Sequence, residues 1–149
     1  MKDFGTFFLI LISITIFYVY LENKAVDVTY VARGGREYLV RNLDDKEQAA
    51  KLLSDICSRL SKLVDHLDTN KDTSNYSDEK KKGIKRMKKN YNPNNVVESS
   101  PGNKYTSYSI NKGEKIVFCI RSKDGSDKLV DLNTMMFVAI HELAHLMSE

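Results

Sequence analysis

The chain begins with an almost continuous hydrophobic segment. Residues 4–21 carry no charge, and 14 of these 18 are apolar or aromatic. As a helix the segment would be about 27 Å long, close to the hydrocarbon thickness of a bilayer. We therefore predict a transmembrane helix over residues 4–21, within an N-terminal anchor region 1–24. A cleaved signal peptide is the alternative, although Tyr-Leu-Glu-Asn at 20–23 lacks the small residues of a cleavage site.

Charges on either side of this segment predict its orientation. Lys2 precedes it, whereas Lys24, Arg33 and Arg36 follow it. Cytoplasmic flanks are usually the more basic ones. The expectation is a single-pass membrane protein whose C-terminal domain, residues 25–149, lies in the cytoplasm.

Strand patterns occur in two pairs within residues 25–149. Residues 28–32 and 37–40 are rich in β-forming types and flank Arg-Gly-Gly-Arg, which predicts a tight hairpin. Residues 105–110 and 115–121 flank Asn-Lys-Gly-Glu and predict a second hairpin. Because residues 116–120 are apolar on both faces, the last strand is expected to lie inside a sheet.

Two helical patterns complete the predicted fold. Apolar residues recur at helical spacing over residues 44–67, where Asp44 and Glu47 resemble a capping box. Residues 133–148, capped by Asn133 or Thr134, are nearly all apolar at first and predict a helix buried on most sides. Residues 69–77 and 90–103 are loop-like. The fold class is therefore α+β, with a small, mostly antiparallel sheet packed by two helices.

Composition narrows the function classes. Hydrophobic residues make up 42% of the chain and charged residues 29%, a globular balance. Two cysteines, Cys57 and Cys119, exclude a disulfide scaffold and are expected to be small buried hydrophobic residues. The net charge of +3 does not by itself indicate nucleic acid.

One segment is much more basic than the rest. Residues 78–89 carry seven lysines and arginines against two acidic residues. Such a segment can attract lipid headgroups or nucleic-acid phosphates. It lacks interleaved aromatic residues for base stacking, so a solvated helix face around Ile84 and Met87 is favoured, and nucleic acid stays an unsupported partner.

The residues that indicate a chemical function form the string His141-Glu142-Leu143-Ala144-His145. Histidines at i and i+4 share one face of a helix and can bind one Zn²⁺, leaving a position open for water. Glu142 is turned by about 100° from His141, so its carboxylate lies beside the metal and can act as a general base on the zinc-activated water. The alternative is a pair of histidines that are hydrogen-bonded within a core.

A complete catalytic zinc site usually has three protein ligands. Glu149 lies on the same face, but it is about 12 Å along the helix from His141. His66 falls on the polar face of the 44–67 helix and is expected to be a surface residue. The third ligand is not visible in the sequence.

From about Val28 onward the chain resembles the zincin metallopeptidases, and more closely the WLM and SprT-like group that includes small proteins of large DNA viruses. The resemblance is carried by residues 37–43, 104–109, 115–119, 131–133 and the histidine motif. It implies zinc ligands His141 and His145, the general base Glu142, and a third histidine shortly after the second. The chain is then expected to be truncated or a remnant. It also implies that the strand at 115–121, or its partner, pairs with an extended substrate.

The predicted function is a membrane-anchored zinc metallopeptidase-like protein that hydrolyses peptide bonds of a peptide or protein substrate. The alternative is a non-catalytic, membrane-tethered interaction module. In that case the zinc motif is vestigial and the basic segment binds lipid or a partner.

Overall fold

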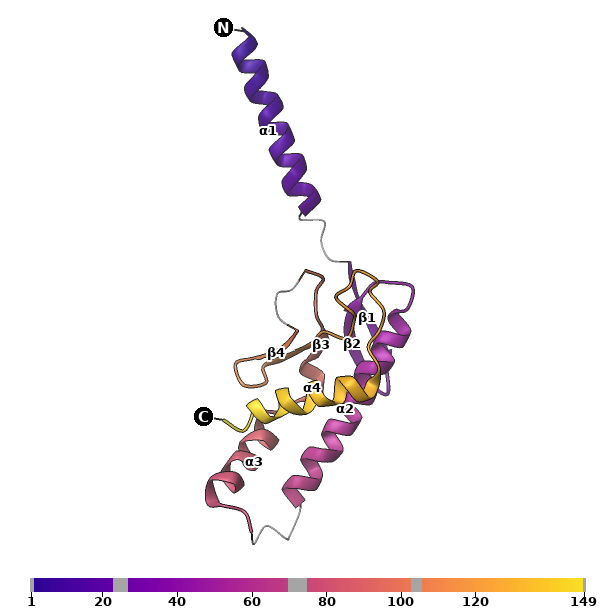
Figure 1. Ribbon diagram of the computed structural model, residues 1–149, viewed down its shortest axis with the longest axis vertical. Coiled ribbons are helices and arrows are strands. Elements are labelled where there is room, and N and C mark those ends of the chain that lie inside the picture. The colour runs from indigo at the N-terminus through magenta and orange to yellow at the C-terminus, as the bar shows by residue number, and fades with distance from the viewer. Residues whose placement is uncertain (1, 23–26, 70–74, 103–105, 149) are drawn as a thin grey trace.

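Two small sheets and the helices around them make up the fold (Figure 1). The structure, a computed structural model, describes residues 2–22, 27–69, 75–102 and 106–148. In chain order the elements are α1 (Lys2–Glu22), β1 (Val28–Arg33), β2 (Arg36–Arg41), α2 (Lys46–Thr69), α3 (Asp78–Asn90), the 3₁₀ turn η1 (Pro93–Asn95), β3 (Val96–Glu98), β4 (Ser107–Ile110), β5 (Lys115–Phe118) and α4 (Leu132–His145).

The N-terminal hydrophobic segment forms helix α1, which stands apart from the other elements in Figure 1. Across the described residues, no helix has both the length and the apolar character needed to cross a bilayer. The predicted transmembrane helix, and with it the single-pass membrane localisation, is therefore wrong. The prediction rested on 18 residues, near the short end of the range that a bilayer requires, so it had little margin. The predicted boundary between residues 24 and 25 lies outside the described residues.

The first hairpin and the long helix form where the sequence predicts them. β1 and β2 pair antiparallel around Gly34 and Gly35, both of which have positive φ. Helix α2 packs on this hairpin with its apolar face, including the buried Leu53, Ile56 and Leu60. It begins only at Lys46, so the expected capping box of Asp44 does not form.

The second sheet has the order β3-β5-β4 and differs from the prediction in one strand. β4 and β5 form the expected antiparallel hairpin, although Tyr105 of the predicted strand lies outside the described residues. β5 is the central strand and buries Ile116, Val117 and Phe118, as expected. β3, within the predicted loop 90–103, adds a parallel strand on the other side of β5. The sheets are thus mostly antiparallel, with one parallel pair.

The structure contains two sheets where one was expected. At the point where β2 could continue the ladder, the backbone N–H of Arg41 donates a hydrogen bond of 2.8 Å to Glu98 Oε2 on β3. The Glu98 side chain therefore takes up the Arg41 N–H, which an adjoining strand would need for its own backbone hydrogen bond. The two sheets meet through this contact instead of merging into one.

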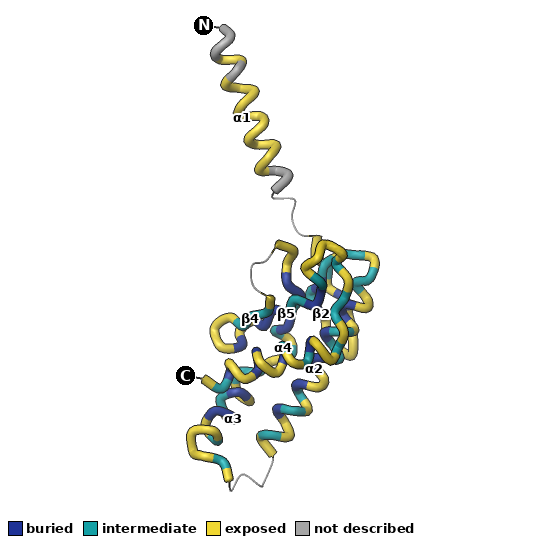
Figure 2. Tube along the Cα trace, in the orientation of Figure 1, coloured by how far each residue is buried: buried dark blue, intermediate teal, exposed yellow. Residues whose placement is uncertain are grey.

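The basic segment forms helix α3, and most of its charged residues are exposed as favoured, whereas Lys81 and Arg86 are half-buried and Arg86 Nε donates a hydrogen bond of 2.7 Å to the Met147 carbonyl. Ser77 caps its first turn, and Gly83, Ile84 and Met87 are buried against the rest of the domain. α3 packs on α2, so three helices cover the core, one more than predicted. Part of the predicted loop 69–77, residues 70–74, lies outside the described residues. Figure 2 shows buried positions running through β2, β5, α2 and α4, which supports the α+β assignment.

Candidate metal centre

Helix α4 positions the histidine motif. Asp131, one residue before the helix and not Asn133 or Thr134, caps it by accepting hydrogen bonds of 3.0 Å from the N–H groups of both those residues. The buried face of α4 contains Met135, Ala139 and Leu143.

The opposite face of α4 is open, contrary to the prediction of a helix buried on most sides. Phe137 is 81% exposed, and His141 and His145 are exposed as well. These three residues are spaced four apart and therefore form one stripe. The apolar composition of the helix did not show which side the sheet leaves uncovered.

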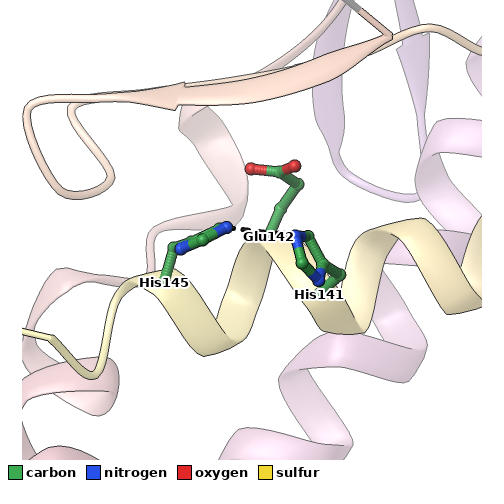
Figure 3. Close-up of side chains that lie close together, drawn as sticks. All are labelled: His141, Glu142 and His145. Carbon is green, nitrogen blue, oxygen red and sulfur yellow. Dashed lines mark hydrogen bonds between the residues drawn. The ribbon is translucent and has the colours of Figure 1, made fainter.

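The two imidazoles lie next to each other on this stripe (Figure 3). Their Nε2 atoms are 3.1 Å apart, and the rings meet edge to face with centroids 4.7 Å apart. Two nitrogens bound to one tetrahedral Zn²⁺ at about 2.0–2.1 Å would be about 3.3 Å apart. The separation of the two Nε2 atoms is therefore close to that of two ligands of one zinc ion, and it is also the length of a hydrogen bond between the two rings.

Glu142 is the buried member of the motif. It is 8% exposed, and in Figure 3 its carboxylate points from α4 toward the neighbouring strand hairpin. One ligand atom from each of His141, Glu142 and His145 falls within 4.8 Å of the others. Among the described residues, nothing forms a hydrogen bond or ion pair with this carboxylate, so its oxygens are available to a water or a substrate.

The motif lines an open groove of about 840 Å³ between α4 and β4. β4 is the edge strand of its sheet in the part of the chain that the structure describes, whereas β5 is paired on both sides. Of the two strands expected to bind substrate, only β4 therefore has one side without a neighbouring strand among the described residues. The groove is lined by Thr106, Ser107, Tyr108, Ser109, Lys112, Phe137, Val138, His141, Glu142, His145 and Ser148.

A third protein ligand is not found among the described residues, where only His141, Glu142 and His145 form a group that could hold a metal. His66 is exposed on α2, as expected, and is not part of this group. Glu149 lies outside the described residues. The described group thus consists of two imidazoles with one carboxylate beside them.

The two cysteines are not part of the site. Both are free, and Cys57 is buried as predicted, whereas Cys119 is only half-buried. Burial raises the pKa of the Cys57 thiol to about 11, so the thiolate that reacts with metals or electrophiles is scarce at neutral pH.

Sequence reasoning missed an ion-pair network around Arg121, in the segment between β5 and α4. Arg121 Nε donates to Glu98 Oε1 at 2.6 Å, and Nη1 donates to Asp45 Oδ2 at 2.8 Å and to the Asp127 carbonyl at 2.9 Å. The available signal was an arginine directly after the apolar run 116–120. Its partners could not be identified because they come from distant segments.

Comparison with known proteins identifies a viral relative of this chain. The chain is 35% identical over 139 residues to the uncharacterized protein R325 of Acanthamoeba polyphaga mimivirus, covering 92% of this chain and 68% of that protein. The chain belongs to the family of this mimivirus protein. No protein-family model and no solved structure matches the chain. The relative's name states no activity, so the resemblance to zincins stays a prediction.

Proposed function

We propose that this chain is a zinc metallopeptidase-like protein of the zincin type, with the groove between α4 and β4 as its peptide site. The observation that supports the proposal is the 3.1 Å separation of His141 Nε2 and His145 Nε2, with the Glu142 carboxylate beside them in the same groove. Because both imidazoles are exposed, they contribute little to the hydrophobic core, and their nitrogens are accessible to an ion from solvent.

Each side chain has a separate task in this proposal. His141 and His145 would hold the ion through Nε2, and in that case each ring would carry its proton on Nδ1. When bound, zinc would supply Lewis-acid chemistry toward water and a peptide carbonyl. Glu142 accepts a proton from the attacking water at its carboxylate and transfers it to the leaving amine.

The free edge of β4 orients the substrate. An extended peptide can add to an exposed strand edge through backbone hydrogen bonds, which do not depend on the peptide's sequence. The edge lies across the groove from the motif, since Thr106 to Ser109 line it together with His141, Glu142 and His145.

The first test is the zinc content of the purified full-length chain, measured by elemental analysis. We expect about one zinc per chain in the wild type, and none in the variant combining His141→Ala with His145→Ala. His66→Ala is the matched control because it removes an exposed histidine outside the groove, and it should keep its zinc. A wild type without zinc, or zinc that survives the double substitution, contradicts the proposal.

Glu142→Gln separates chemistry from metal binding. It removes the general base but leaves both imidazoles, so the variant should bind zinc like the wild type. Its rate of peptide hydrolysis should fall by about 100-fold or more. If the zinc-loaded wild type and Glu142→Gln are equally inactive, the motif is vestigial and the interaction-module alternative gains support.

A further inference from the structure

The groove has different chemistry at its two ends. Among its lining residues Lys112 is the one lysine or arginine, and Glu142 is the one acidic residue. Lys112 lies on the turn between β4 and β5. At the other end, the lining residues Phe137 and Val138 are apolar.

The turn that carries Lys112 is held in a strained conformation. Asn111 and Lys112 have φ values of 45° and 55°, in the left-handed region that side chains other than asparagine, aspartate and glycine rarely adopt. The next residue, Gly113, is buried, and Asn95 Nδ2 donates a hydrogen bond of 3.0 Å to its carbonyl. Packing therefore fixes the backbone at Lys112, which is one of the residues that line the groove.

The same packing places Lys112 over the C-terminal end of α4. A Cβ on Gly113 would lie 3.5 Å from Leu146 Cδ2, so this turn and the end of the helix are in direct proximity. Phe137 is four residues before His141, toward the other end of the helix. From position 137 to position 146 an α-helix rises by about 13 Å, which four residues of an extended strand also span.

Phe137 does not belong to the hydrophobic core, and its exposed ring is available for contact with a ligand. At 81% it is the most exposed of the large hydrophobic residues in the described chain. An apolar side chain bound against it would bury surface worth about 25 cal/mol per Å². Because side chains four apart on a strand point the same way, one peptide can place an apolar residue on Phe137 and an acidic one at Lys112.

We propose that the groove selects extended peptides in which an apolar residue and an acidic residue are separated by about four positions. The apolar residue packs on Phe137, and the carboxylate of the acidic residue pairs with the Lys112 ammonium. This selectivity rests on the proposed peptide site, but it concerns binding and does not require that a bond be cleaved.

The test measures binding of fluorescent peptides to the full-length chain by anisotropy. The peptides carry one leucine and, four positions away, Asp, Asn or Lys, and they are made in both chain directions. For one direction we expect the Asp peptide to bind about two- to fivefold more tightly than the Asn peptide, as for a solvent-exposed ion pair. The Lys peptide should bind least tightly.

Variants of the turn assign the preference to Lys112. Lys112→Glu should reverse it in favour of the Lys peptide. Lys112→Asn should abolish it while the turn stays folded, since asparagine tolerates positive φ. Lys115→Glu is the matched control: this exposed lysine begins β5 and does not line the groove, so the variant should keep the wild-type preference.

The outcomes separate this inference from the proposed function. Equal binding of the three peptides, no measurable binding, or the wild-type preference in Lys112→Glu overturns the selectivity, even if zinc and Glu142-dependent cleavage are found. A charge preference that depends on Lys112 in a chain without zinc supports the selectivity and overturns only the proposed function.

Discussion

The guanidinium of Arg121 lies in the interior, where it binds oxygen atoms from three separate segments. Its side chain is 4% exposed and that of its partner Glu98 is 1% exposed. Glu98 in turn accepts the Arg41 N–H from β2, and Asp45 precedes α2. The pair therefore connects both sheets with the start of a core helix and with the loop that leads into α4.

Loss of the Arg121 charge should destabilise the folded state. Arg121→Met leaves the buried Glu98 carboxylate without its ionic partner, and we expect the free energy of unfolding to fall by about 3–5 kcal/mol. Chemical denaturation measures this change.

Lys51→Met is the matched control for Arg121→Met. It removes a cation from an exposed ion pair with Asp55 one helical turn away, whose side chains are 58% and 40% exposed. Such pairs contribute about 0.3–0.5 kcal/mol. Equal losses in the two variants would show that the Arg121–Glu98 pair has no special structural role.

At the scale of elements, the β4–β5 hairpin and helix α4 form the two walls of the groove. Helix α4 carries His141, Glu142 and His145, and β4 is the outer strand of its sheet among the described residues. The spacing of the two walls depends on the turn at 111–114, where Gly113 packs closely on the backbone of Asn90 at the end of α3. An ideal Cβ at Gly113 would lie 2.4 Å from the Asn90 carbonyl oxygen, well inside van der Waals contact.

Gly113→Ala tests this close approach. Its φ of 101° makes alanine strained, and the added methyl group also meets the backbone at Asn90. Gly35→Ala is the control because its φ of 79° is also positive, but nothing lies within 4 Å of the added Cβ. We expect a loss of about 1–2 kcal/mol for Gly35→Ala.

The clash should make Gly113→Ala less stable than Gly35→Ala by about 2 kcal/mol. Thermal or urea unfolding gives the comparison. If the two variants were equally stable, the turn would not be fixed against Asn90, and Lys112 would lose the support that positions it.

At the scale of the whole molecule, several carboxylates are stabilised in the folded state. Hydrogen bonding to Arg121 lowers the pKa of Asp45, and hydrogen bonding to Arg41 lowers that of Asp127. The side-chain hydrogen bond to Thr134 lowers the pKa of Asp131, and hydrogen bonds to Ser126 and Ser122 lower that of Asp124 to about 2. These groups lie around the start of α2, in the loop before α4 and at its N-cap.

These shifts predict an acid-sensitive fold. Each folded-state pKa lies below the ordinary value of 3.8, so the unfolded chain binds protons first as pH falls. Their stabilisation is present above about pH 5 and is lost between about pH 5 and pH 2. The urea midpoint should therefore be lower at pH 3 than at pH 7. Asp131→Asn can still cap α4 but cannot titrate, so its midpoint should fall less; an identical fall would exclude Asp131 as a contributor.

Local patterns in the sequence determined most of the elements and the core of the site. Glycines between β-rich runs predicted both hairpins, and apolar spacing predicted α2 and α4 to within a few residues at either end. The spacing of His141 and His145 by four residues placed both rings on one helix face. All of these depend on the geometry of a few consecutive residues, which sequence periodicity records directly.

The tertiary structure alone decided what surrounds those elements. The three residues of β3 are a strand because they pair with β5, and Arg121 is buried because its partners arrive from elsewhere in the chain. The open face of α4 at Phe137 and the position of Lys112 above its end follow from how the hairpin packs on the helix. Such features arise from contacts between distant segments, and the periodicity of neighbouring residues in the sequence gives no information about them.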